Sequence, residues 1–98
     1  MLVAAASAVL ALATADRAAA AGVLRAARCD HCHDSAVSAG NAAALAVYDL
    51  HLPEWPSTMS DEQLPKMMGR LRNAPPKDRE VVRKFIAAEL ASRHAPRR

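Results

Sequence analysis

Apolar residues recur at helical spacing over the second half of the chain, whereas no segment shows the apolar–polar alternation of a half-buried strand. One apolar stripe, spaced i, i+3, i+4 and i+7, consists of Leu64, Met67, Met68 and Leu71. A second stripe, in a last helix predicted over residues 77–93, consists of Val82, Phe85, Ile86 and Leu90. The pattern therefore predicts an all-α fold.

Polar residues with short side chains mark where two earlier helices begin. A first helix is predicted over residues 16–28, with Asp16 as its N-cap. A second helix is predicted over residues 42–49, with Asn41 as its cap.

Proline separates the helices in the middle of the chain. Residues 51–58 contain two prolines and are predicted to form a stiff, extended loop. Ser60 and Gln63 have the spacing of a capping box and would open the helix of the first stripe, which residues 73–76 then end. The pattern predicts four short helices with a proline-containing loop between them.

The first fifteen residues differ from the rest. They form an apolar stretch that ends in Ala13-Thr14-Ala15, a small-x-small pattern typical of signal-peptidase sites. The stretch is short for a membrane span, and it lacks a Lys or Arg near Met1. The interpretation is a signal peptide over residues 1–15 and one domain over residues 16–98, exported to an oxidising compartment; the alternative is an alanine-rich helix.

Composition limits the core that this domain can build. Hydrophobic residues make up 52% of the 98 residues, but many are alanine, and the aromatic residues are only Tyr48, Trp55 and Phe85. Alanine favours helix but buries little area, so the core of so small a domain is expected to be thin. A staple or an apolar cofactor would meet that need.

The segment "RCDHCHDS", residues 28–35, holds both cysteines and two of the four histidines. Cys29, Cys32 and His33 form C-x-x-C-H, the attachment pattern of covalent haem. Two thiols three positions apart lie about one helical turn apart, so each can add to one vinyl group on the same porphyrin edge. The imidazole of His33 is then placed to bind the iron. We therefore expect one covalent haem c.

Three other kinds of site could be built from the same residues. A zinc-binding structural module would need Cys29, Cys32, His33 and a fourth ligand such as His51 or His94, but there is no second ligand pair of the usual spacing. A dithiol oxidoreductase would need a strand beside the motif, and none is predicted. A disulfide across two residues would constrain little of the chain.

With this motif the chain resembles the cytochrome c family, in particular its small bacterial monohaem members. The other matching features are Leu24 ahead of the motif, "MSDEQL" at residues 59–64, and a last helix that contains Phe85 and Ile86. The resemblance implies that the first and last helices cross and that a loop methionine binds the far side of the iron. It covers about residues 16–94.

The chain departs from the family pattern at two positions. Arg25 stands where the family has an aromatic residue, and Gly22 is one place away from the usual glycine. These departures concern the packing of the first and last helices rather than the attachment of haem.

The second axial ligand has several candidates. Met59 lies on the loop and outside either stripe, so it is the first candidate, with a surface methionine as the alternative. Met67 and Met68 lie on an apolar stripe, where core packing is the simpler interpretation. His51 and His94 are further candidates, and an iron with no sixth ligand is the last possibility.

The resemblance and the motif together predict a single-electron carrier and not an enzyme, with a five-coordinate haem enzyme or ligand-binding module as the alternative. We expect a periplasmic monomer that docks transiently with redox proteins. The net charge of +3 is spread along the chain, which argues against nucleic-acid binding. Trp55, Arg70 and Arg72 are possible partners of haem propionates, with packing or a solvated helix face as the alternatives, and no stable membrane insertion is expected.

Overall fold

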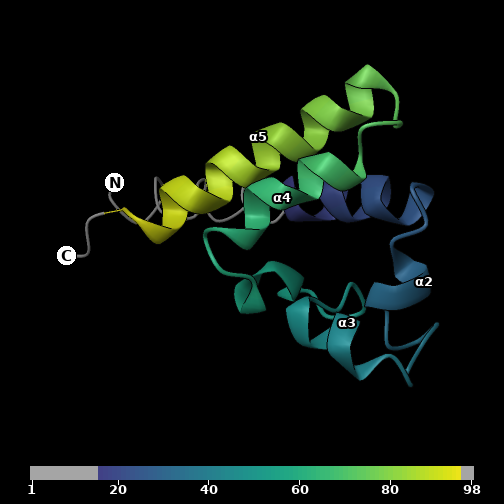
Figure 1. Cartoon of the computed structure of the whole chain (residues 1–98). Helices are drawn as coiled ribbons and strands as arrows, with labels where there is room; N and C mark the ends of the chain where they lie inside the picture. Colours follow the sequence, from purple (N-terminus) through teal and green to yellow (C-terminus); the bar gives the residue numbers. More distant parts are fainter. Residues whose placement is uncertain (1–15, 96–98) are drawn as a thin grey trace.

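The computed structural model describes residues 16–95, and every regular element in that range is helical (Figure 1). Residues 16–26 are helical, and the elements that follow are α2 (Asp30–His33), α3 (Ala42–Val47), the 3₁₀ turn η1 (Trp55–Thr58), α4 (Gln63–Arg70) and α5 (Pro76–Arg93). The all-α prediction is confirmed, while the predicted signal segment lies outside the described residues. Within those residues, no helix has the length and apolar character needed to cross a membrane.

The first helix ends earlier than predicted, at a turn centred on Arg28. The amide of Cys29 donates to the Leu24 carbonyl at 2.9 Å, and the amide of Arg28 donates to the Arg25 carbonyl at 3.0 Å. These two bonds form a Schellman motif, whose C′ residue adopts the left-handed conformation. Arg28 occupies that position with φ of 68°, where glycine is usual. The turn leads the chain directly from the first helix into α2. At the other end, Asp16 is itself helical, so its predicted role as N-cap is wrong.

The cap predicted for the second helix is confirmed, but the extended loop is only partly correct. The Asn41 side chain accepts a hydrogen bond from the Ala44 amide at 3.4 Å, and α3 ends at Val47, two residues before the predicted end. Residues 55–58 form a 3₁₀ turn instead of extended chain. The fixed φ of Pro56 suits the first turn of a helix, which is why a proline-containing segment can coil here.

The capping box before α4 forms in full. The Gln63 amide donates to Ser60 Oγ at 3.1 Å, and the Ser60 amide donates to Gln63 Oε1 at 2.8 Å. At the other end of the 71–75 connection, α5 begins at Pro76, where proline is favoured because its missing N–H has no helical partner.

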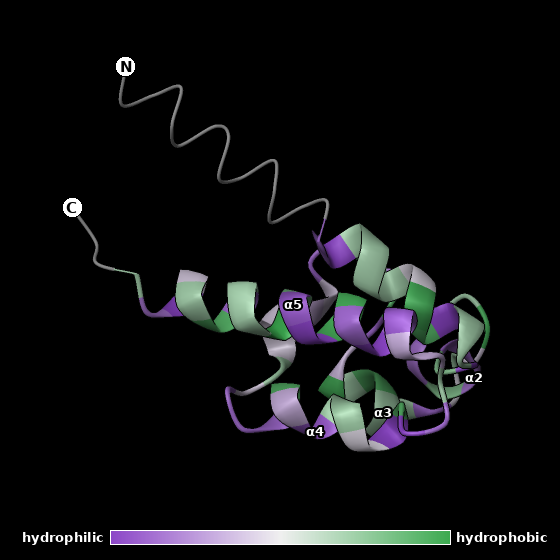
Figure 2. Ribbon diagram, turned by 90° about the horizontal axis from the view of Figure 1, so that it is seen from above, coloured by the Kyte–Doolittle hydropathy of each residue, from purple (hydrophilic) through white to green (hydrophobic). Residues whose placement is uncertain are grey.

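The core lies where α5 packs against both the helical segment 16–26 and α4. In Figure 1, α5 runs above these two elements, and in Figure 2, turned by 90°, it lies between them. The largest side chains with almost no exposure are Phe85, Leu24, Leu64, Leu71, Val82 and Pro56. The stripe residues Met68 and Leu90 are only partly buried at its edge. Glu89 on α5 is also buried, which the apolar pattern did not predict; its carboxylate accepts hydrogen bonds from Arg17 at 3.1 to 3.4 Å. This ion pair joins the first and last helices.

Replacing Arg28 by glycine is expected to stabilise the protein. An L-residue at φ of 68° is strained, and removal of the side chain relieves the strain at some cost in chain entropy. Arg28→Gly should raise the free energy of unfolding by about 0.5–1 kcal/mol in urea titrations. The control is Arg72→Gly, in the exposed turn after α4, which should be neutral or destabilising. Destabilisation by Arg28→Gly would contradict the assigned turn.

Candidate functional site

The motif segment folds into one helical turn that gathers its three reactive side chains. The amides of Cys32 and His33 both donate to the Cys29 carbonyl, at 3.2 and 2.9 Å. Residues at i, i+3 and i+4 lie on the same face of a helix. Both cysteines are free thiols, Cys29 half-buried and Cys32 exposed, and both line the same cavity as His33.

This cavity has a volume of about 500 Å³. Four parts of the chain line it, namely residues 24–33, residues 41–48, Met59 and residues 63–70. Its volume lies within the range of about 300–1,000 Å³ that is usual for small-molecule sites. Beside the motif, its apolar walls are formed by Leu24, Ala44, Val47, Tyr48, Met59 and Met67. Its polar lining consists of Arg28, Asn41, Gln63, Lys66 and Arg70. The site thus combines an apolar interior with three basic residues.

Contacts with two backbone carbonyls and with the Tyr48 ring hold the imidazole of His33 in one orientation. Its Nδ1 lies 2.9 Å from the Ala44 carbonyl oxygen and 3.2 Å from the Tyr48 carbonyl oxygen. A carbonyl only accepts, so Nδ1 carries the proton and the lone pair is on Nε2. The ring also stacks on the Tyr48 ring, with centroids 3.9 Å apart and planes within 6°. Histidines that bind metals characteristically donate their other ring N–H to a carbonyl in this manner.

Arg25 secures the chain around His33. Its guanidinium pairs with the Asp34 carboxylate and donates to the Leu50 carbonyl at 3.0 Å. The Leu50 amide in turn donates to the His33 carbonyl at 2.6 Å. Asp34 is 2% exposed, and the hydrogen bond from Arg25 lowers the pKa of its carboxyl. The first helix, the motif and the chain after α3 are therefore tied together beside the cavity.

Burial changes the acid–base character of the cavity wall. Loss of solvation raises the pKa of the Cys29 thiol, and burial likewise raises the pKa of the Tyr48 hydroxyl. Both groups are therefore neutral at pH 7. Thiol–disulfide exchange uses the thiolate, so this chemistry is disfavoured at Cys29.

The structure brings two of the five predicted distal ligands to the cavity. Met59 is 4% exposed and Met67 is 5% exposed, and both line it. Neither the half-buried Met68 nor the exposed His51 lines the cavity. His94 Nε2 lies 2.7 Å from Asp61 Oδ2, also outside the lining. The surface-methionine interpretation of Met59 is therefore wrong.

The four ligands of the zinc alternative do not come together. Neither His51 nor His94 lines the cavity that contains the cysteines. Across residues 16–95, no group of three His, Cys, Asp or Glu side chains is arranged to hold a metal ion.

Sequence reasoning named Arg70, which lines the cavity, but it missed other polar lining residues. Gln63 and Lys66 lie on α4 with Arg70 at the i, i+3 and i+7 spacing of one helix face, and the three flank the stripe that contains Met67. This spacing beside the apolar stripe is a pattern in the sequence that could have predicted a polar edge to the cavity. Arg28 gave no such signal, because its position depends on the left-handed turn. Arg72 does not line the cavity.

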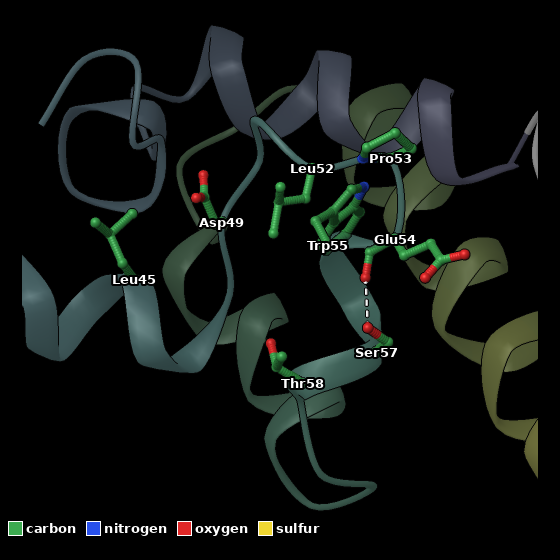
Figure 3. A pocket seen from close by; sticks show the side chains of 8 residues that line it. All are labelled: Leu45, Asp49, Leu52, Pro53, Glu54, Trp55, Ser57 and Thr58. Atoms are coloured by element: carbon green, nitrogen blue, oxygen red, sulfur yellow. Dashed lines mark hydrogen bonds between the residues drawn. The ribbon is translucent and has the colours of Figure 1, made fainter. Parts of the chain in front are cut away.

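Trp55 belongs to a different cavity, of about 310 Å³, shown in Figure 3. There the Ser57 hydroxyl donates to the Glu54 carbonyl at 2.7 Å, which closes the turn beside the indole. The Trp55 ring also packs on Phe85 and Tyr48, with centroids 5.0 and 5.6 Å apart. Trp55 is thus buried among other aromatic residues and does not line the cavity that contains the cysteines.

The chain has no significant match among protein-family models, curated proteins or solved structures. The assignment of a function therefore depends on the chemistry of this cavity.

The Arg25–Asp34 pair predicts a specific pH dependence of stability. The folded-state pKa of Asp34 is lowered from its ordinary value of 3.8, so the pair stabilises the fold above that pH and loses its effect as pH falls below it. Asp34→Asn should therefore lower the urea midpoint at pH 7, and the difference from the natural chain should shrink below about pH 4. The control is Asp30→Asn, since Asp30 has no ion pair among the described residues. A difference that is constant with pH would contradict the assignment.

Proposed function

We propose that this protein is a single-electron carrier with one covalent haem c in the cavity of about 500 Å³. The observation that carries the proposal is the convergence of Cys29, Cys32, His33 and Met59 on that cavity. Met59 comes from a part of the chain distant from the motif, so its presence there is independent of the pattern that suggested haem.

The residues around the cavity fit this group in three respects. Two free thiols and an imidazole lie on one wall, where each S–H can add across a vinyl C=C bond to give a thioether. The Nδ1 hydrogen bonds of His33 leave Nε2 as the nitrogen that can bind iron. The three basic residues Arg28, Lys66 and Arg70 can offset the negative charge of two propionates.

When bound, the haem supplies the one-electron couple of its iron. Cys29 and Cys32 would prevent its loss, and His33 would hold the iron on one side. A thioether from Met59 would stabilise the reduced iron and so raise its potential. The apolar walls, which include the buried Leu24 and the half-buried Val47, would help to exclude water from the group. We propose that the chain is exported and that the haem would exchange electrons with redox proteins that dock transiently.

Covalent attachment gives the first test. Full-length protein from a host equipped for haem ligation should be coloured, and after denaturation its intact mass should exceed that of the processed chain by one haem. Cys29→Ser and Cys32→Ser should each leave a single thioether, and the double variant should lose the haem on denaturation. The control is His31→Ala, an exposed spacer in the motif, which should keep both links. Zinc, by contrast, would leave on denaturation, and a colourless protein of bare mass would end the proposal.

The distal ligand can be assigned by a pair of matched variants. Met59→Leu should abolish the methionine–iron absorption band of the oxidised protein and lower its reduction potential. It should also make cyanide binding at least about tenfold faster, because the sixth position is then open. Met67→Leu, an equally buried change on α4, should keep the band and the slow rate. The reverse result would assign Met67, and rapid cyanide binding by the unmodified protein would favour the five-coordinate alternative.

A further inference from the structure

The side chain of Arg93, in the last turn of α5, reaches the segment that presents Met59. Its Nη1 donates to the Met59 carbonyl at 2.7 Å, and its Nη2 donates to the Pro56 carbonyl at 2.8 Å. The same Nη1 lies 3.0 Å from Asp61 Oδ1. One guanidinium therefore bridges two backbone carbonyls three residues apart and a carboxylate beyond them.

The same segment is also held by one local hydrogen bond and by one to α3. The Met59 amide donates to the Pro56 carbonyl at 3.0 Å, and the Thr58 hydroxyl donates to the Val47 carbonyl at 2.7 Å. The capping box begins at Ser60, immediately after Met59. Arg93 joins the Met59 and Pro56 carbonyls to α5, in addition to the packing of Trp55 on Phe85 and the contact of His94 with Asp61. Its donors are charged and only 23% of its side chain is exposed, so its hydrogen bonds are stronger than those of a surface ion pair.

Arg93 is itself held by a buried carboxylate. Its Nε lies 3.9 Å from Glu89 Oε1, and the Glu89 side chain is 7% exposed. Arg17 contacts the same oxygen at 3.1 Å from the first helix. A buried carboxylate between two guanidiniums keeps both in place, because an unpaired charge there would be costly. The position of Met59 is thus linked to the contact between the first and last helices.

We propose that Arg93 is a positioning residue that keeps the Met59 side chain in the cavity wall and thereby sets how often this methionine leaves it. The consequence for iron rests on the proposed function, whereas the retention of Met59 in the wall does not. Loss of the guanidinium would free the Met59 and Pro56 carbonyls to bind water, and the segment would open more often.

The first measurement does not require haem. Full-length protein carrying Arg93→Met, which keeps the length of the stem but removes the donors, is treated with dilute hydrogen peroxide. Sulfoxide at each methionine is followed by peptide mass spectrometry. Met59 should oxidise about tenfold faster than in the natural chain, while Met67 in the same sample should be unchanged. Equal acceleration at both methionines would mean general unfolding and would overturn the proposal.

The second measurement reads the iron. In haem-bearing protein, Arg93→Met should bind cyanide about tenfold faster and weaken the methionine–iron band. In a Met59→Leu background, Arg93→Met should have no further effect on the cyanide rate, because the ligand that it positions is gone. The control is Arg83→Met, on the same helix, whose exposed pair with Glu80 should leave both readouts unchanged.

The two proposals can fail separately. Haem-bearing protein with unchanged Met59 oxidation and cyanide rate in Arg93→Met would overturn the role of Arg93 and leave the electron-carrier proposal standing. Protein without covalent haem but with selective Met59 oxidation would overturn the electron-carrier proposal and support the positioning role.

Discussion

The hydrogen bonds from His33 Nδ1 to the carbonyls of Ala44 and Tyr48 are the constraint on which the site depends. Both acceptors belong to α3 or to the residue that ends it, so this six-residue helix acts as a support for the imidazole. So short a helix has little stability of its own, and its cap at Asn41 and its packing on the motif keep it in place. The stack of Tyr48 on the His33 ring then fixes the plane of the imidazole. The positions of the two thiols are fixed as well, because Cys29 and Cys32 share one helical turn with His33.

Two arginines each hold an irregular segment next to a residue that lines the cavity. Arg25 ties the segment that carries His33 to the chain after α3, and Arg93 ties the segment that carries Met59 to α5. Each donates to a backbone carbonyl of an irregular segment and pairs with a carboxylate. An alanine-rich chain has few large side chains with which to hold such segments by packing. Arginine side chains hold these segments in place instead, because one guanidinium can donate to two acceptors at once.

The cavity places two free thiols beside apolar walls and basic residues. Burial holds Cys29 and Tyr48 in their neutral forms, and the surrounding walls are apolar except for a polar lining with three basic residues. Such a lining suits a largely apolar ligand with acidic substituents. A group of that kind would also enlarge the thin core, since the area that it buries would add to that of the few aromatic residues.

The sequence by itself determined the elements whose signals are local. The Asn41 cap, the capping box of Ser60 and Gln63, and the turn that gathers Cys29, Cys32 and His33 involve residues at most four positions apart, so the pattern was enough to predict them. Only the tertiary structure decided that Met59 is buried, that Met67 rather than Met68 lines the cavity, and that Glu89 is buried between two arginines. Each of these depends on which elements pack together and on contacts such as Arg93 with Met59, 34 positions away. Such contacts form only when the helices have packed, and no local pattern of apolar and polar residues encodes them.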